Sequence, residues 1–249
     1  MMGHMSARPH NKPTARQRVR DQITAEILQA ARGQLAESGA GAISLRAIAR
    51  DLGMASSAVY RYFPSRDEVL TSLIVAAYDA VGQTAEDARD AAAAQGLAPS
   101  DIFCTVWRAV RAWALAHPHE YALIYGSPVP GYRAPADTVP PATRLPWVLL
   151  GVLAQTGARA PAPPKAAPAL GQALSPLRAE AAVAGFDDQT LLAALTSYSA
   201  LVGAISFELF GHIHNVVDPD PAARSAFFDG QLDLMLALVG MPPGAHVPT

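Results

Sequence analysis

Eight side chains between positions 44 and 66 have the types and spacing of a surface that holds a phosphate backbone and reads base edges. Each carries a hydroxyl or a guanidinium group, and they are Ser44, Arg46, Ser56, Ser57, Tyr60, Arg61, Tyr62 and Arg66. Helix N-termini and cations bind phosphates, so Ser44, Arg46 and Arg66 are expected there. Short hydroxyl side chains and arginine recognise bases in a major groove, so Ser56, Ser57 and Arg61 are expected to face them.

Two short helices around a tight turn must position these side chains. The first covers residues 45–52 with Ser44 as its cap, Gly53 interrupts it, and the second covers residues 57–63. Apolar residues would lock the pair against a preceding helix over about 14–38, and they are Ile48, Leu52, Val59 and Phe63. This pattern is typical of a helix-turn-helix, whose second helix enters a DNA major groove. Ordinary surface positions on a helix pair are the alternative interpretation.

The segment 43–66 resembles the corresponding segment of the TetR family of regulators. The positions that carry the resemblance are Ser44, Arg46, Ile48, Ala49, Leu52, Gly53, Val59, Tyr60, Tyr62, Phe63, Ser65 and Arg66. Tyr62 stands where the family often has histidine, and Arg66 where it often has lysine. The resemblance implies that the hydroxyls of Tyr60 and Tyr62 contact the DNA backbone. It also implies an all-α fold, with an N-terminal three-helix helix-turn-helix domain and a C-terminal helical domain for ligand binding and dimerisation.

The C-terminal part of the chain resembles a subgroup of the same family. That subgroup has a Trp-His-Gly signature, and the segment 203–212 here is similar to its continuation. This chain keeps Gly203 from the signature and has Val202 in place of the histidine.

Charge is divided unevenly along the chain. Residues 1–66 hold ten basic and four acidic residues, a net charge of +6, whereas the remainder holds nine and 17, a net charge of −8. A basic head on an acidic body is typical of a polyanion-binding domain joined to a second domain. A solvated basic tail is the alternative. We expect a disordered basic arm at 1–13, a DNA-binding domain at 14–66 and the ligand-binding and dimerisation domain at 67–249.

Helical spacing continues after residue 66. A capping box at Ser65 and Glu68 opens a long helix that runs towards Ala94. Further helices are expected near 100–117, 119–126, 143–156, 169–182, 188–214 and 221–239. The proline-rich stretches 128–146 and 158–168 are expected to be loops.

The last two of these helices are apolar on more than one face, which indicates burial on both sides. The family resemblance implies that they pair with their copies in a homodimer. The residues expected at that interface are Leu201, Ile205, Phe228, Leu232, Met235 and Leu236. One large monomeric core is the alternative.

A ligand pocket is expected among the middle helices, lined by large aromatic side chains and a few polar groups. The expected ligand-binding residues are Trp107, Arg111, Tyr125, Trp147, Tyr198, Phe207, Glu208 and His212. Together these features predict a ligand-responsive regulator, a repressor that a small, largely apolar molecule releases from a palindromic double-stranded operator. A helical small-molecule-binding protein without a DNA role is the alternative.

Other classes of function have little support in the sequence. The paired histidines at 117 and 119, and at 212 and 214, are two residues apart and point to different helix faces, so no metal site is expected. No nucleophile elbow, phosphate loop or dinucleotide motif is present, so we expect neither an enzyme nor a cofactor. A single cysteine and the lack of a secretory signal or membrane span favour a cytoplasmic protein with no membrane partner.

Overall fold

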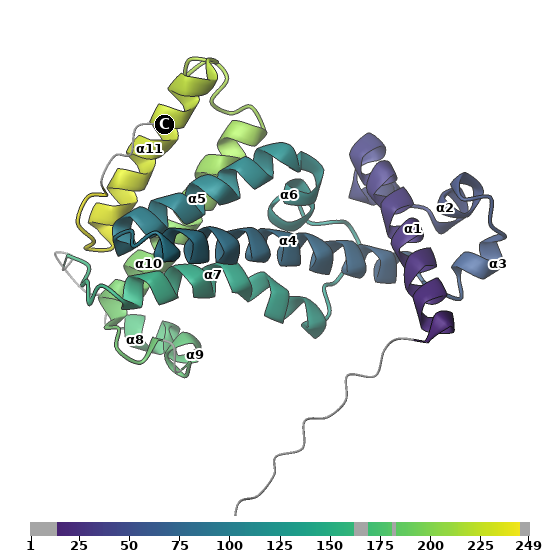
Figure 1. Ribbon diagram of the computed structural model, residues 1–249, viewed down its shortest axis with the longest axis horizontal. Coiled ribbons are helices and arrows are strands. Elements are labelled where there is room, and N and C mark those ends of the chain that lie inside the picture. The colour runs from purple at the N-terminus through teal and green to yellow at the C-terminus, as the bar shows by residue number, and fades with distance from the viewer. Residues whose placement is uncertain (1–13, 162–168, 181–182, 245–249) are drawn as a thin grey trace, which may run out of the picture. The chain divides into compact units, whose positions relative to one another are not determined.

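The computed structural model describes residues 14–161, 169–180 and 183–244, in which the regular structure is helical throughout (Figure 1). This confirms the all-α fold expected from the sequence. The predicted basic arm at 1–13 and most of the second proline-rich stretch lie outside the described residues. The chain divides into two compact units, one ending at Leu73 and the other beginning at Ile74.

The N-terminal unit contains a long helix followed by the two short helices of the helix-turn-helix. Their bounds are α1 (Ala15–Ser38), the 3₁₀ turn η1 (Ala40–Ala42), α2 (Leu45–Asp51) and α3 (Ser56–Val59). The Thr14 hydroxyl caps α1 by accepting from the Gln17 amide at 3.2 Å. Gly53, with φ of 63°, makes the turn after α2 in a conformation that most other residues avoid. The second short helix stops earlier than predicted, and its chain continues as hydrogen-bonded turns to Phe63.

Apolar contacts hold this unit together as the sequence predicted. Ile48 and Val59 have no exposed surface, Phe63 is buried, and Leu52 is half-buried. They lie in one unit with Ile27, which is buried on α1. The residues whose spacing predicted a core are therefore largely buried in this unit.

The C-terminal unit is a helical bundle. It comprises most of α4 (Arg66–Ala94), then α5 (Pro99–Ala116), α6 (Pro118–Tyr125), η2 (Ala136–Thr138), α7 (Val139–Ala154), α8 (Leu170–Ala173), α9 (Ser175–Arg178), α10 (Asp188–Leu209) and α11 (Pro221–Leu238). Helix α5 packs against α7, α10 and α11, so it lies at the centre of the bundle core. The capping prediction at the start of α4 is confirmed, because the Ser65 hydroxyl accepts from the Glu68 amide at 3.2 Å.

Three of the predicted helix boundaries are wrong in this unit. The stretch 128–146 was expected to be a loop and the next helix to begin near residue 143, but α7 begins at Val139, because prolines at 140 and 141 occupy its first turn, where no amide is needed. The expected helix at 169–182 is two single turns in its described part. The expected helix at 188–214 ends at Leu209, and Gly211 follows with φ of 80°.

Helix α10 is long and apolar enough to cross a membrane by length and composition alone. It is, however, a core helix of the bundle that contacts α5, α6 and α11. Only a third of its most apolar stretch is buried within one chain.

Candidate nucleic-acid interface and internal cavity

The polar side chains predicted to bind DNA lie on or near the surface of the N-terminal unit. Those of Arg46, Ser56, Ser57, Tyr60 and Arg61 are exposed, and Tyr60 is 42% exposed. None of these five is in the apolar core, so each can meet a ligand without a change of fold. Their elements are the N-terminal turn of α2, the short α3 and the turn that follows it.

Ser44 is half-buried and shapes the start of α2. Its hydroxyl accepts from the Ala47 amide at 3.4 Å, while its own amide donates to the Gln34 side-chain oxygen at 3.0 Å. The Gln34 amide group also reaches Asp51 at the other end of α2, at 3.3 Å. Gln34 therefore ties both ends of α2 to α1, and sequence reasoning missed it because the contacts are long-range.

Arg66 has a structural contact that the sequence did not predict. Its Nη2 donates to the Ala40 carbonyl at 2.8 Å, and its Nη1 lies 3.9 Å from the Asp67 carboxylate. The side chain is 30% exposed. Arg66 thus fixes the turn between α1 and α2 in addition to any contact with phosphate.

A shallow groove lies between the start of α1 and α3. Arg16, Arg20 and Arg61 border it, and the guanidinium of Arg20 lies 5.4 Å from the centre of the Tyr62 ring. A cation over an aromatic face is attracted by the ring quadrupole and holds that ring in place. The predicted set did not contain Arg16 and Arg20, although their four-residue spacing in a basic stretch was the available signal.

In the C-terminal unit, a buried ion pair joins α5 to α10. Arg111 donates through Nε and Nη2 to the two carboxylate oxygens of Glu208, at 2.7 and 2.6 Å. The side chains are 14% and 6% exposed. Nη1 of Arg111 lies 3.3 Å from the Ser225 hydroxyl on α11, and Phe228 lies under the guanidinium. The pair therefore joins three helices and leaves Arg111 little freedom to bind anything else.

Four tyrosines, Tyr121 buried and the other three half-buried, form a second polar cluster. Tyr121 donates to the Val202 carbonyl at 2.8 Å, and the hydroxyls of Tyr125 and Tyr198 lie 3.3 Å apart. Tyr78 meets Tyr125 edge-on, with ring centres 6.1 Å apart. Burial raises the pKa of Tyr121 to about 12 and also raises the pKa of each of the other three. All four therefore stay neutral near pH 7.

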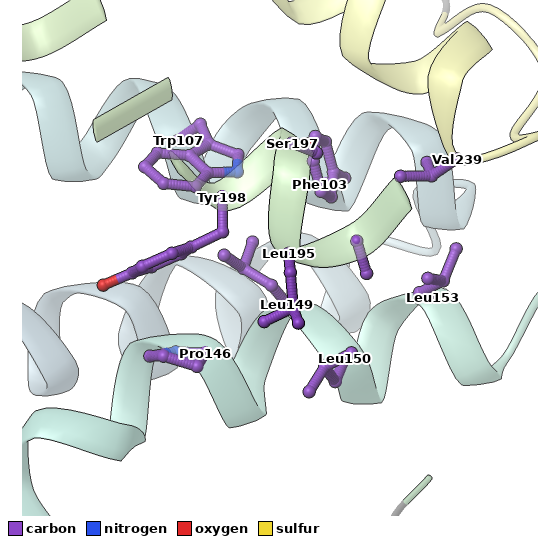
Figure 2. Close-up of a pocket in the computed structure, with 11 residues that line it drawn as sticks. Phe103, Trp107, Pro146, Leu149, Leu150, Leu153, Leu195, Ser197, Tyr198 and Val239 are labelled. Atoms are coloured by element: carbon purple, nitrogen blue, oxygen red, sulfur yellow. The ribbon is translucent and has the colours of Figure 1, made fainter. Parts of the chain in front are cut away.

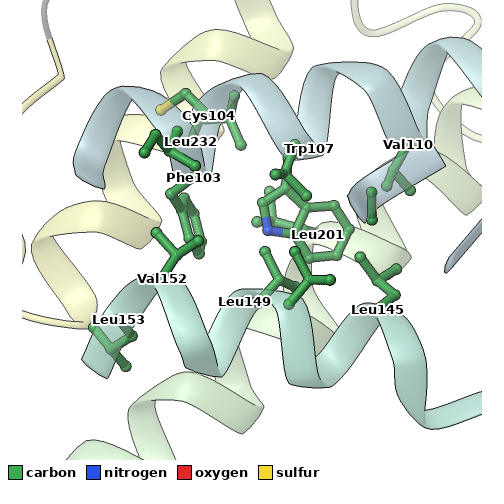
Figure 3. Packing of buried hydrophobic residues seen from close by; sticks show 14 of the residues in the cluster. Phe103, Cys104, Trp107, Val110, Leu145, Leu149, Val152, Leu153, Leu201 and Leu232 are labelled. Carbon is green, nitrogen blue, oxygen red and sulfur yellow. The ribbon is translucent and has the colours of Figure 1, made fainter. Parts of the chain in front are cut away.

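A cavity of about 110 Å³ lies between α5, α7 and α10 (Figure 2). Trp107 and Tyr198, two of the predicted pocket residues, line it together with Ser197. The α7 wall is Pro146, Leu149, Leu150 and Leu153. The same helices continue into the apolar core around Phe103 and Leu201 (Figure 3). The cavity borders this packed core and is partly open to the surface, because Leu195 in its wall is 40% exposed.

The other predicted pocket residues lie elsewhere. Arg111 and Glu208 bind each other, and Tyr125 reaches the cavity only through its contact with Tyr198. Trp147 packs against a separate apolar cluster that contains Leu191. Phe207 is 56% exposed and stacks on the exposed His212, which follows the end of α10.

The residues predicted for the dimer interface lie mainly inside the single chain. Met235 is half-buried, and the other five are at most 2% exposed: Leu201, Ile205, Phe228, Leu232 and Leu236. A side chain with no exposed surface in one chain has no surface left to bury against a second chain. The predicted residues therefore lie on the inward face of each helix. The outward apolar side chains of the same two helices, with Phe210 just after α10, are Leu192, Leu195, Phe207, Phe210, Phe227 and Leu234.

No group of three metal-binding side chains comes together in the part of the chain that the structure describes. Several carboxylates within that part are in ion pairs. Glu208 is paired with Arg111, and Asp229 is paired with Arg108 at 2.8 Å.

An N-terminal helix-turn-helix on a helical bundle defines a class of DNA-binding transcriptional regulators. Two family models match the chain: "Bacterial regulatory proteins, tetR family" over residues 27–73, and "Tetracyclin repressor-like, C-terminal domain" over residues 103–235. The chain belongs to the TetR family, as its sequence pattern predicted, and it is a transcriptional regulator rather than an enzyme.

Known relatives agree with this assignment. The HTH-type transcriptional regulators Mb1846 of Mycobacterium bovis and Rv1816 of Mycobacterium tuberculosis are each 41% identical to the chain, over 90% of it and 95% of their own length. The crystal structure of SCO4313, described as a regulatory protein, matches with a TM-score of 0.70 and 36% identity, over 90% of this chain and 99% of that one. The regulator PfmR of Thermus thermophilus shares the fold, with a TM-score of 0.50 and 19% identity over 87% and 98% of the two chains.

Proposed function

We propose that this regulator is a homodimeric repressor that leaves a palindromic operator when a small, largely apolar molecule enters the C-terminal unit. The observation that carries the proposal is the apolar cavity among α5, α7 and α10, in a chain whose other unit is a helix-turn-helix. Regulation requires the molecule to bind the state that releases DNA more tightly than the state that holds it.

The DNA contacts in this proposal are the exposed polar residues of α2, α3 and the following turn. Arg46 and the N-terminal turn of α2 bind phosphate, with Tyr60 and Tyr62 on the backbone. Ser56, Ser57 and Arg61 face the bases. Arg16 and Arg20 add cations beside Tyr62, and Arg66 acts mainly by holding the turn at Ala40.

The homodimer in this proposal uses the outward face of α10 and α11. Every exposed residue of α11 is uncharged, and so are every exposed residue of α10 from Leu192 to Phe207 and the exposed Phe210 that follows the helix. A helix face that is apolar and free of charge is unfavourable in water and marks an interface. A two-fold dimer places the same patch on both partners, so the face must complement itself, as two uncharged helices can.

Selection and sequencing of genomic fragments bound by the purified protein tests the DNA role. The expected result is enrichment of a palindrome that Arg46→Ala together with Tyr60→Phe abolishes. If no sequence is enriched, the chain is a helical binding protein without a DNA role.

Sedimentation tests the dimer separately. Phe227→Glu with Leu234→Glu is expected to give monomers at micromolar concentration, whereas Leu115→Glu, a matched change at an exposed leucine of α5, is expected to leave the dimer intact. A dimer that survives both charges on α11 would contradict this interface.

A further inference from the structure

Two buried polar atoms at the cavity have no hydrogen-bond partner among the described residues: the Trp107 indole Nε1 and the Ser197 hydroxyl oxygen. Trp107 has no exposed surface and Ser197 is 2% exposed. Both residues line the cavity, one from α5 and the other from α10 (Figure 2). A donor and a hydroxyl without a partner are therefore both buried in the wall beside the same apolar space.

The hydroxyl of Ser197 behaves differently from its neighbours on the same helix. Thr196, Ser199 and Ser206 each donate to the carbonyl four residues earlier, at 2.8, 2.9 and 2.9 Å. This contact is the usual way for a helical hydroxyl to satisfy itself. Ser197 makes no such bond within the described chain, although it is the buried member of the set. Its hydroxyl is thus buried without a partner in a residue of the cavity wall.

Buried polar groups in folded proteins are nearly always paired, because an unpaired one loses its hydrogen bonds to water. Two at one cavity indicate a missing partner. An indole N–H can only donate, so the partner must offer an acceptor, and a hydroxyl can donate to or accept from the same group. An oxygen atom on a ligand meets both requirements.

The surroundings also limit the charge of that ligand. None of the described lining residues is charged. Arg111, four residues after Trp107 on α5, gives two of its nitrogens to Glu208. An anion in the cavity would therefore have no cation to pair with, and burying it would be costly.

The size of the cavity restricts the ligand further. A dry apolar cavity of about 150 Å³ is known to hold benzene. At about 110 Å³, and with the rings of Phe103, Trp107 and Tyr198 in its wall, this cavity suits one small ring.

We propose that the effector is a small neutral molecule with a single ring and an acceptor oxygen, such as a phenol, and that Trp107 and Ser197 recognise this oxygen. This inference rests on the proposed function in one respect, because it takes this cavity to be the site where the effector binds. The recognition itself can be tested without DNA.

The test uses phenol and toluene, which have the same shape and differ in a hydroxyl against a methyl group, with benzoate as the anion. NMR follows the indole N–H signals of the full chain during titration, and Trp107→Phe assigns the signal of Trp107. Phenol is expected to bind and to move the Trp107 signal downfield, as a new hydrogen bond does. Toluene is expected to bind without that shift, and benzoate is expected not to bind. Binding of phenol without the downfield shift, preferential binding of benzoate, or binding of none of the three would overturn the proposal.

Two variants test the oxygen contacts by affinity. Ser197→Ala and Trp107→Phe are each expected to weaken phenol binding about tenfold and toluene binding by less than threefold, since only phenol loses a partner. Ser199→Ala and Trp113→Phe are the matched controls on the same two helices, and they are expected to leave both affinities unchanged. Equal loss of phenol and toluene in Ser197→Ala would contradict oxygen recognition.

A separate measurement distinguishes this inference from the proposed function. If phenol binds with the expected indole shift but does not change DNA affinity, the effector role of the cavity fails and its chemistry stands. If another molecule releases DNA while the Trp107 signal and phenol binding show no oxygen contact, the regulator stands and this inference fails.

Discussion

The two units of the chain keep their polar groups in opposite environments. In the N-terminal unit, Arg46 is exposed on α2, and Tyr60 and Arg61 are exposed on the turn after α3. In the C-terminal unit, Arg111 and Glu208 are buried against each other, and Ser197 is buried beside a cavity. An exposed polar group can bind a charged polymer, and it loses little free energy when no polymer is bound. A buried group must be paired at all times or await a specific partner.

This contrast predicts that the same kind of substitution acts on different properties in the two units. Removing a polar group from the N-terminal surface is expected to change DNA affinity at nearly constant stability. Removing one from the C-terminal core is expected to change stability or ligand affinity. The following changes test this difference, from the largest expected effect to the smallest.

Glu208→Ala is expected to give the largest effect, because it leaves the Arg111 guanidinium buried without its partner. Loss of one member of a buried pair typically lowers the free energy of unfolding by about 3–5 kcal/mol. Urea denaturation measures it, and Asp90→Ala, which breaks the exposed pair with Arg89, is the control that is expected to leave the stability nearly unchanged. Similar losses of unfolding free energy in the two variants would show that the Arg111–Glu208 pair does not have the energetics of a buried pair. The double change Arg111→Met with Glu208→Leu is expected to recover most of the stability.

Arg61→Ala is expected to weaken specific DNA binding by about 1–3 kcal/mol and to reduce discrimination between bases at one position of each half-site. Its stability should change by less than about 0.5 kcal/mol, because the side chain is exposed. Anisotropy titrations against the selected palindrome and its single-base variants measure both effects. A uniform loss over all sequences would make Arg61 a phosphate contact instead.

Raising the pH above 10 is expected to destabilise the C-terminal unit through Tyr121. Burial raises the pKa of this residue in the folded chain from 10.0 to about 12. Its contribution is therefore complete below pH 10 and is lost as the pH rises towards 12, since the unfolded chain gives up the proton first. The expected loss is about 1 kcal/mol by pH 11. Denaturation curves of the wild type and Tyr121→Phe at several pH values measure it, and parallel pH dependence in both would contradict the assignment.

Ser44→Ala is expected to have the smallest effect. The hydroxyl caps α2 at 3.4 Å, a long contact, so the loss should lie near the low end of cap removal, about 0.5 kcal/mol. Thermal unfolding measures it, and Ser44→Thr is the control that keeps a capping hydroxyl. A loss well above about 1 kcal/mol would show that Ser44 does more than cap α2.

The sequence predicted the N-terminal unit well because its signals are local. The cap at Ser44, the turn at Gly53 and the apolar spacing of Ile48 and Val59 all act within a few residues, and the structure shows each of them. The sequence did not reveal the long-range contacts of Gln34 and Arg66 in this unit, because these contacts join residues ten or more positions apart.

The C-terminal unit was harder to predict for the same reason. Arg111 and Glu208 are 97 positions apart, so the sequence placed both in the ligand pocket and gave no sign that they bind each other. Proline was read as a loop signal at the start of α7, although it is favourable in a first helical turn. Ser197 was missed because a short polar side chain does not stand out within an apolar helix. It lies four residues after the buried Ala193 and four before the buried Leu201, and this spacing was the signal available.

The most direct test of the account is the salt dependence of DNA binding by the full chain, measured by anisotropy on the selected palindrome. If the exposed cations of the N-terminal unit hold phosphates, the logarithm of the association constant should fall linearly with the logarithm of salt concentration. The slope should decrease by about one in Arg46→Ala, whereas Arg89→Ala, a change on α4 in the other unit, should leave it unchanged. Affinity that is independent of salt, or a slope that Arg46→Ala does not alter, would contradict the account.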